Sequence, residues 1–282
     1  MGRCWLNIDY LAIGHICADL QPDGSTRLGG TALFAALTAH HLGVQAAIVT
    51  ACGADLDLTA LPQGLPVLRQ PSQHTTLFEN RYGPEGRTQL LHARAEPIDL
   101  HGIPAEWRNA PIVHLAPVMQ ELPVADSALR FASALVAATP QGWLRHVQPS
   151  HLVVTTPATL PELPLDGTQV VIVSEEDVQG DEQLVWQLSE RIPLVVLTRA
   201  ERGATVLRAG QAHDVPAFQA QVVDPTGAGD VFAAALACAL YQGEEPVAAT
   251  RWACATAAWA IEAPGPSGLP TAAMVRQRLS QG

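Results

Sequence analysis

Lysine is absent from this chain of 282 residues, because all 16 of its Lys-plus-Arg positions are arginines. This absence excludes a Walker-type phosphate loop, a protein-kinase active site and a Schiff-base enzyme, since each of them depends on a lysine amine. Any phosphate chemistry would have to rely on backbone N–H groups, arginine or a metal ion.

Cysteine is also scarce and shows no motif. The chain has five cysteines, an odd number, and none of them forms a Cys-x-x-Cys pair. This pattern disfavours both a disulfide scaffold and a structural zinc site. It indicates a protein of the reducing cytoplasm.

Long apolar runs and a basic surface are missing as well. No stretch of about 18 residues is apolar and uncharged, so the sequence predicts no membrane span. With 27 acidic and 16 basic residues, the net charge is −11. This charge argues against nucleic acid as a partner. We therefore expect neither a membrane nor a nucleic acid to be bound.

The chain is rich in apolar segments that alternate with helical patterns. Apolar residues make up 48% of the chain and charged residues only 15%, which predicts a large buried core. The alternation predicts βαβ units and a mostly parallel sheet. Strands are expected at 10–14, 47–50, 112–115, 152–155, 170–173 and 194–198. Helices are expected at 30–42, 126–138, 181–191, 228–242, 246–261 and 271–279.

Two stretches interrupt this alternation. Residues 21–28 and 75–92 are more polar and contain more turn formers, and 81–87 has the composition of a hairpin tip. We expect a small antiparallel excursion from the main sheet, which could cover a site.

The most informative segment is the Gly-rich turn at 224–229, which leads into a helix with one apolar stripe. Such a turn presents free N–H groups at a helix N-terminus, where the backbone dipole favours an anion. Gly227 and Gly229 would let the backbone approach a ligand closely. Asp230, in the first helical turn, is the right type of group to accept a proton from a hydroxyl that attacks a phosphoryl group.

Other interpretations of this segment were open. Asp230 could be only a favourable first-turn acid, and the glycines could form only a tight turn. A dinucleotide-binding Gly-x-Gly-x-x-Gly loop is disfavoured, because its third glycine would fall at Phe232.

The stretch from Asp224 to Phe232 resembles, without a gap, the C-terminal signature of the ribokinase (PfkB) family of carbohydrate kinases. Further landmarks of the family occur in the proper order. They are the first-strand motif at 14–19 that ends in Asp19, the di-glycine Gly29-Gly30, the Gly-x-Asp at 53–55 and the nucleotide-side segment at 198–204. Together they extend over nearly the whole chain.

The resemblance implies one ribokinase-like domain over residues 1–282. This would be an α/β fold with a doubly wound, mostly parallel sheet, helices on both faces and a small β-sheet lid near 21–28 and 75–92. It implies transfer of the γ-phosphoryl group of ATP to a substrate hydroxyl. Asp230 would be the general base, and the N–H groups of Gly227, Ala228 and Gly229 would form the anion hole, which needs no lysine.

The resemblance also implies ligand contacts. Mg²⁺ would bridge the phosphates, with Asp177 holding it through a water, and Asp224 would lie near a monovalent cation such as K⁺. Arg199 or an arginine from the lid would add positive charge. The ATP-side residues would be Ser174, Thr198, Ala200, Gly203, Thr226, Gly227 and Gly229. The substrate-side residues would be Asp19, Gly29, Gly30, Thr31, Phe78 and Arg81, with Asn80 beside them.

The chain departs from the family pattern at three places. Ser174 and Asp177 replace the ends of an Asn-x-x-Glu motif related to magnesium, and they could equally be an acidic strand end that opens a helix. Ala200 replaces a glycine. Phe34 stands where ribokinases place a sugar-binding asparagine, which argues against ribose because a phenyl ring makes no hydroxyl contacts.

Three hypotheses for the ligand were left open. The first is a kinase for a sugar, polyol or cyclitol, since parts of the chain resemble the myo-inositol kinase branch. The second is a nucleoside kinase, in which Phe34 and Phe78 sandwich a base instead of packing in the core. The third is a non-catalytic ligand-binding member, against which the retained Asp230 argues. By analogy with the family, the protein would be a monomer or a homodimer paired through the lid.

Overall fold

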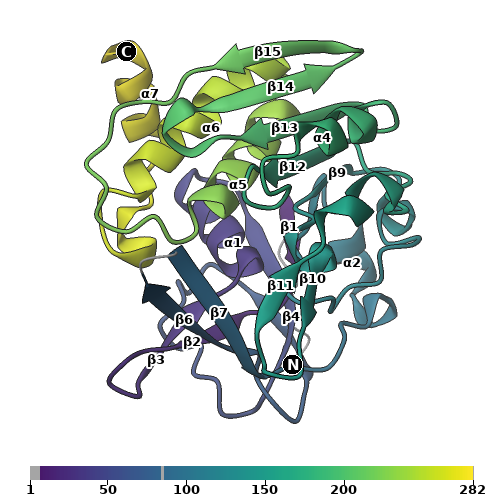
Figure 1. The fold of residues 1–282 in the computed structure, drawn as a ribbon, viewed down its shortest axis with the longest axis vertical. Coiled ribbons are helices and arrows are strands. Elements are labelled where there is room, and N and C mark those ends of the chain that lie inside the picture. Colours follow the sequence, from purple (N-terminus) through teal and green to yellow (C-terminus); the bar gives the residue numbers. More distant parts are fainter. Residues whose placement is uncertain (1–6, 84–85, 282) are drawn as a thin grey trace.

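The computed structural model describes residues 7–83 and 86–281. Nine strands form the main sheet: β1 (Tyr10–Ile13), β4 (Ala46–Cys52), β5 (Val67–Pro71), β8 (Ile112–Leu115), β9 (Leu135–Ala138), β12 (Val170–Ser174), β13 (Leu194–Thr198), β14 (Ala204–Arg208) and β15 (Gln211–Val215). Their order is β15-β14-β13-β12-β9-β8-β1-β4-β5 (Figure 1). All neighbours from β13 to β5 pair in parallel, while β14 and β15 run antiparallel at one edge.

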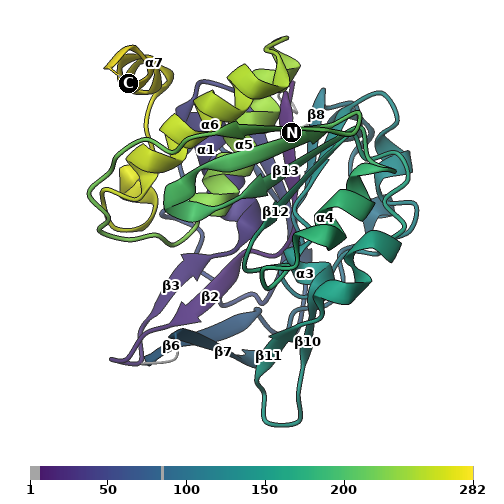
Figure 2. The same cartoon turned by 45° about the horizontal axis from the view of Figure 1, so that its top comes forward.

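Helices cover both faces of this sheet (Figure 2). One face carries α1 (Thr31–His41), α5 (Ala228–Tyr241) and α6 (Pro246–Ala260), with α7 (Ala272–Gln281) outside them. The other face carries α2 (Ala105–Arg108), α3 (Gln141–Leu144) and α4 (Glu182–Ser189). Val196 packs in the first core and Val195 in the second, so the central strands are buried on both sides.

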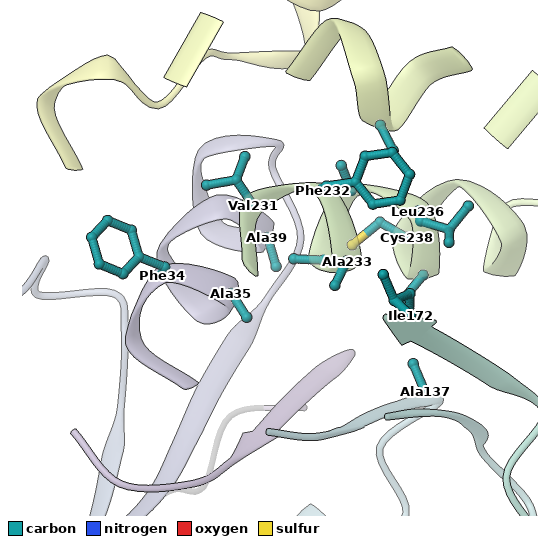
Figure 3. Packing of buried hydrophobic residues seen from close by; sticks show 14 of the residues in the cluster. Phe34, Ala35, Ala39, Ala137, Ile172, Val231, Phe232, Ala233, Leu236 and Cys238 are labelled. Atoms are coloured by element: carbon teal, nitrogen blue, oxygen red, sulfur yellow. The ribbon is translucent and has the colours of Figure 1, made fainter. Parts of the chain in front are cut away.

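The helices α1 and α5 pack closely through small residues. Ala35 and Ala39 of α1 lie toward Ala233 of α5, and α5 in turn rests on Ile172 of β12 (Figure 3). Small side chains let the two helix backbones approach each other, so the N-terminal ends of α1 and α5 are held next to one another.

A second, four-stranded sheet lies against the end of the main sheet where α1 and α5 begin (Figure 1). It contains β2 (Cys17–Leu20), β3 (Thr26–Gly29), β6 (Leu77–Gly83) and β7 (Gly86–Ala93), in the order β3-β2-β6-β7, and we call it the lid. The predicted fold class, a doubly wound and mostly parallel sheet with a small β-sheet lid, is confirmed. Of the predicted hairpin tip, residues 84 and 85 lie outside the described residues.

Several predicted elements were wrong or missed. The helix expected at 126–138 is instead a short 3-10 helix, Ala128–Phe131, followed by β9, a short strand buried between β8 and β12. A four-residue apolar run fits either structure, so periodicity alone could not decide. The strand expected at 152–155 forms a separate hairpin of β10 (Arg145–Val147) and β11 (Val153–Thr155). The strands β5, β14 and β15 were not predicted.

No helix in the described part of the chain is both long and apolar enough to span a membrane.

Candidate active site

The Gly-rich turn before α5 is built around Gly227, which has a φ of 78°, a left-handed conformation that favours glycine. Its carbonyl accepts from the N–H of Val231 at 2.9 Å, and the N–H of Ala228 donates to the carbonyl of Pro225 at 3.2 Å. Among the described residues, the N–H groups of Gly227 and Gly229 have no protein acceptor. Two of the three amides predicted for the anion hole are therefore available to a ligand.

Phe34 of α1 packs directly against this turn. A Cβ atom added to Gly227 would lie 2.6 Å from Cδ1 of Phe34, so the ring fills the space beside the glycine. The ring is 4% exposed and belongs to the core cluster of α1 and α5. Phe34 could either stack on a nucleoside base or pack in the core, and the structure supports core packing. The ring also contacts the Gly-rich turn before α5.

Asp230 lies in the first turn of α5, near buried groups at the start of the lid. Burial raises the pKa of the Cys17 thiol, and the charges of Glu121, Asp19 and Asp230 raise it further, while Arg145 opposes them. Burial likewise raises the pKa of Tyr10, and Asp230 again contributes. The charges of Asp19 and Asp230 therefore both act on the buried Cys17 thiol.

Ser174 and Asp177, at the end of β12, bind each other. Oδ2 of Asp177 accepts from the N–H of Ser174 at 2.9 Å and from its hydroxyl at 2.8 Å. In return, Oγ of Ser174 accepts from the N–H of Asp177 at 3.1 Å. This reciprocal arrangement caps the turn after β12, which agrees with the simpler of the two interpretations of this segment.

The end of β13 forms a tight turn through Ala200 and Gly203. Gly203 has a φ of 93°, and Ala200 has a φ of 48°. The N–H of Arg199 donates to the carbonyl of Gly203 at 2.7 Å, and the N–H of Gly203 donates to Ala200 at 3.0 Å. Ala200 adopts the left-handed conformation that glycine prefers, which explains why the family motif has a glycine at this position. Thr198 ends β13 directly before this turn.

Ion pairs connect the ends of β12 and β13. Arg199 donates to Oε1 of Glu175 at 3.4 Å and to Oε2 of Glu182 at 3.0 Å, and Arg202 also pairs with Glu175. The hydrogen bond from Arg199 holds the pKa of Glu182 below its usual value. The positive charge of Arg199 therefore faces protein carboxylates, and the expectation that it supplements the anion hole is not supported.

Asp224 joins the donor-side turn to the loop after α6. Its Oδ1 accepts from the N–H of Thr226 at 2.9 Å, and its Oδ2 accepts from the N–H of Gly265 at 3.0 Å. Burial acts to raise the pKa of Asp224, but these hydrogen bonds and the charge of Arg27 hold it below its ordinary value. The carboxylate is therefore ionised at neutral pH.

The residues considered for metal binding could supply only some of the ligands of a metal ion. In the part of the chain that the structure describes, no three His, Cys, Asp or Glu side chains gather as a set of metal ligands. Mg²⁺ commonly uses one or two carboxylates together with phosphate oxygens and water. The carboxylate of Asp177 is the right chemical type for such a partial Mg²⁺ ligand set, and that of Asp224 for a monovalent cation.

The acceptor side begins at the di-glycine before α1. The carboxylate of Asp19 lies directly over Gly29, and a Cβ atom there would collide with its Oδ2. Gly30 has a φ of 100°, and a Cβ atom there would collide with the carbonyl of His15. Both glycines are therefore required by close approach, and Thr31 then begins α1 as a buried residue.

Polar side chains of the lid extend from Asp19 in a short chain of hydrogen bonds. Nδ2 of Asn80 donates to Oδ1 of Asp19 at 3.5 Å, and Nε2 of Gln89 donates to Oδ1 of Asn80 at 2.9 Å. Phe78 lies opposite Asp19 in the strand register and is only 3% exposed. The structure thus brings Asp19, Phe78 and Asn80 together, and it adds Gln89, which the sequence did not single out.

Arg81 lies elsewhere on the lid. Its Nε pairs with Oε1 of Glu79 at 2.5 Å, and His92 contacts the other oxygen of Glu79 at 2.7 Å. Side chains alternate along a strand, so Arg81 and Glu79 are on the opposite face of β6 from Asn80. The structure does not bring Arg81 to Asp19.

A buried hydrogen-bond network at the base of the lid was not predicted from the sequence. Nε2 of His15 donates to the carbonyl of Glu96 at 3.0 Å, and the hydroxyl of Thr76 donates to Nδ1 at 2.8 Å. The N–H of His15 donates to Oε1 of Glu121 at 2.9 Å, and burial lowers the pKa of His15. These residues lie where β2 and β6 begin and β7 ends. The partners are 61 to 106 positions apart in sequence, so no local motif could reveal them.

Comparison with known proteins confirms the resemblance to the ribokinase family. Residues 170–272 match the model described as pfkB family carbohydrate kinase. The cytidine kinase of Thermococcus kodakarensis is 26% identical over 243 residues, which are 80% of this chain and 86% of that protein. The bifunctional protein HldE of Rhodopseudomonas palustris is 34% identical over 114 residues, which are 40% of this chain but only 23% of that protein.

A solved structure shares the fold over almost the whole chain. It is a pyrophosphate-dependent kinase in the ribokinase family, complexed with a pyrophosphate analogue and myo-inositol. The two chains superpose with a TM-score of 0.75 at 23% identity, covering 96% of this chain and 99% of the other. The C-terminal part of the chain thus matches the pfkB family of carbohydrate kinases, and the whole chain has the fold of the ribokinase-family structure.

Proposed function

We propose that the protein is an ATP-dependent kinase that phosphorylates a hydroxyl of a sugar, a polyol or a cyclitol. The observation that carries this proposal is geometric: Asp19 lies over Gly29 just before α1, and Phe34 of α1 packs against Gly227, the residue before the helix turn that holds Asp230 and the open amide of Gly229. An acceptor-binding carboxylate, a base and an anion site are then within one small region.

The proposed reaction is a direct displacement at phosphorus. The acceptor oxygen forms a bond to the γ-phosphorus, and its proton passes to the carboxylate of Asp230. The bond from the γ-phosphorus to the bridging oxygen breaks, and the electron pair leaves with ADP. The amides of Gly227 and Gly229, joined by that of Ala228 if it leaves Pro225, stabilise the negative charge that develops. A bound Mg²⁺ would neutralise phosphate charge, and Asp177 is the residue to hold it through a water.

The ATP side is proposed to lie along the ends of β12 and β13. Ser174, Thr198, Ala200, Gly203 and Thr226 border this region, which is stiffened by the ion pairs of Arg199. The loop at 222–224 hydrogen-bonds to Ile261 and exposes Val222 and Val223 by 64% and 58%. Asp224, held ionised beside this loop, is the proposed neighbour of a monovalent cation such as K⁺.

A nucleoside is the second candidate acceptor, because a cytidine kinase is among the relatives. The described structure does not support an aromatic sandwich for its base. Phe34 is buried in the cluster of α1 and α5, whereas Phe78 is buried in a separate cluster with Cys17 and Met119. A polyol, which needs hydroxyl-binding carboxylates and amides, fits Asp19, Asn80 and Gln89 better.

The test is turnover on a panel of acceptors. The protein is incubated with Mg-ATP and, separately, with Mg-pyrophosphate, together with sugars, cyclitols and nucleosides, and acceptor-dependent release of ADP or phosphate is measured. ADP release that requires a sugar or cyclitol supports the proposal. Turnover with nucleosides alone would select the second candidate, and ligand binding without any turnover would indicate a non-catalytic member. Size-exclusion chromatography with light scattering distinguishes a monomer from a lid-paired dimer.

A further inference from the structure

Positive side-chain charge near the transferred phosphate has to come from arginine, because the chain has no lysine. Two nearby arginines already face carboxylates. Arg199 binds Glu182, and Arg81 binds Glu79 on the outer face of the lid. An arginine that binds phosphate would have to be one that is not already paired with a protein carboxylate.

Arg27 of β3 is on the inner face of the lid. In the antiparallel pair of β2 and β3, Arg27 lies opposite Asp19, so both side chains project from the same face. The next residue, Leu28, projects from the other face and packs against the core cluster of α1 and α5. Two residues after Arg27 the chain reaches Gly29, which contacts Asp19. The register therefore fixes Arg27 on the side of the acceptor carboxylate.

The charge of Arg27 also acts on Asp224, which precedes the donor-side turn. It contributes to the lowered pKa of Asp224, after the effects of burial and of the hydrogen bonds from Thr226 and Gly265. It makes a smaller contribution to the lowered pKa of Asp23 in its own hairpin. Within the described residues Arg27 makes no ion pair within 4.0 Å, and its side chain is exposed. A guanidinium on the Asp19 face of the lid is thus left without an ion-pair partner among the described residues.

We propose that Arg27 is a catalytic residue that binds the transferred phosphoryl group from the lid side, opposite the amides of Gly227 and Gly229. This inference rests on the proposed kinase function. The planar guanidinium can bind two phosphoryl oxygens at once, and no bond to it forms or breaks. Its role is to stabilise charge on the equatorial oxygens while the proton passes to Asp230 and the electron pair leaves with ADP.

The experiment compares three variants of the full chain. Arg27→Met removes the charge and keeps an apolar stem, whereas Arg27→Lys restores a charge without the planar fork. The matched control is Arg208→Met, because Arg208 is similarly exposed but lies on β14, where it pairs with Glu245 at 3.6 Å. Each protein is assayed for kcat and KM with its best acceptor, and for the rise in Tm caused by Mg-ATP and by Mg-pyrophosphate without acceptor.

We expect Arg27→Met to lower kcat on the order of 10²-fold, the loss typical for removal of one group that stabilises transition-state charge. Arg27→Lys should recover part of this loss. The Tm rise with Mg-ATP should shrink in Arg27→Met, and Arg208→Met should behave as the wild type in both assays. Equal kcat and equal Tm rise for Arg27→Met and wild type would overturn the inference.

The two proposals fail in different ways. A wild type that turns over no acceptor contradicts the proposed function, and the Tm rise alone then decides the role of Arg27 in phosphate binding. A wild type that turns over normally, together with a fully active Arg27→Met, contradicts only the inference about Arg27.

Discussion

The donor side and the acceptor side of the candidate site use different parts of the chain to contact a ligand. On the donor side, backbone N–H groups of Gly227 and Gly229 are open, while the nearby Arg199, Asp177 and Ser174 bind other protein groups. On the acceptor side, glycines make room for side chains, and the polar chain from Asp19 to Gln89 lies on the lid. In the proposed mechanism the donor is therefore held mainly by backbone geometry, and the acceptor mainly by side-chain chemistry.

Amino-acid substitutions on the two sides of the site are therefore expected to have different effects. Side chains on the lid can be exchanged without moving the turn that binds phosphate, so acceptor specificity can change while the transfer machinery stays in place. Apart from the proposed metal contact of Asp177, changes on the donor side act mainly by moving the backbone. Phe34 is the exception, because it belongs to the helix that follows the acceptor glycines and yet packs against Gly227.

The largest effect is expected at Asp230, where the two sides meet. Asp230→Asn keeps the size of the side chain and removes the base, so kcat should fall by about 10²- to 10⁴-fold. Steady-state ADP release measures this loss, and circular dichroism with the unfolding Tm serves as the control for folding. Full turnover by Asp230→Asn would exclude it as the base.

The next largest effect separates two glycines of the same turn. Gly227→Ala places a methyl group against the buried ring of Phe34 at a positive φ, so the turn has to shift and kcat should fall on the order of 10²-fold. Gly229→Ala is the comparison variant, because no protein atom lies within 4 Å of the added Cβ, so it can affect only the approach of a ligand. A similar loss of kcat in both variants would show that backbone geometry at Gly227 is not the cause.

A smaller and more selective effect is expected on the acceptor side. Asp19→Asn removes the charge that binds the acceptor hydroxyls, so KM for the acceptor should rise about 10- to 100-fold, the value of a charged hydrogen bond. The KM for ATP should stay within about twofold of the wild type. Equal changes in both KM values would contradict the division into two sides.

The smallest effect is expected at Asp177. Asp177→Ala removes the proposed contact with a metal-bound water, so the Mg²⁺ concentration for half-maximal activity should rise several-fold. Ser174→Ala removes the hydrogen bonds between the Ser174 hydroxyl and Asp177 but keeps the Asp177 carboxylate. It therefore controls for any effect of a weakened turn. An unchanged Mg²⁺ titration in Asp177→Ala alone would assign the residue a purely structural role.

The sequence predicted those features that depend on local patterns. The helix expected at 228–242 is observed as Ala228–Tyr241, and the predicted Gly-rich turn lies directly before it, with Gly227 at a positive φ. The short strand β9 was mistaken for a helix, because its place in the sheet is decided by its neighbours β8 and β12. Features that depend on distant partners, such as Glu121 binding the N–H of His15, required the structure.

The side-chain directions on the lid also required the structure. The sequence placed Arg81 in the substrate pocket because it lies in the predicted lid, but the strand register turns it toward Glu79. The same register turns Arg27 inward, although no motif marked it. A shift of one residue reverses which side chains face the site, and the sequence does not fix that register.

The central claim is that the protein moves a phosphoryl group from the donor turn to a hydroxyl bound under Asp19. The most direct measurement is a single-turnover reaction with ATP labelled in its γ-phosphate, followed by separation of the products. The account predicts that the label appears on the sugar or cyclitol acceptor and that Asp230→Asn blocks its transfer. Label found only in inorganic phosphate, or remaining in ATP with every acceptor, would contradict it.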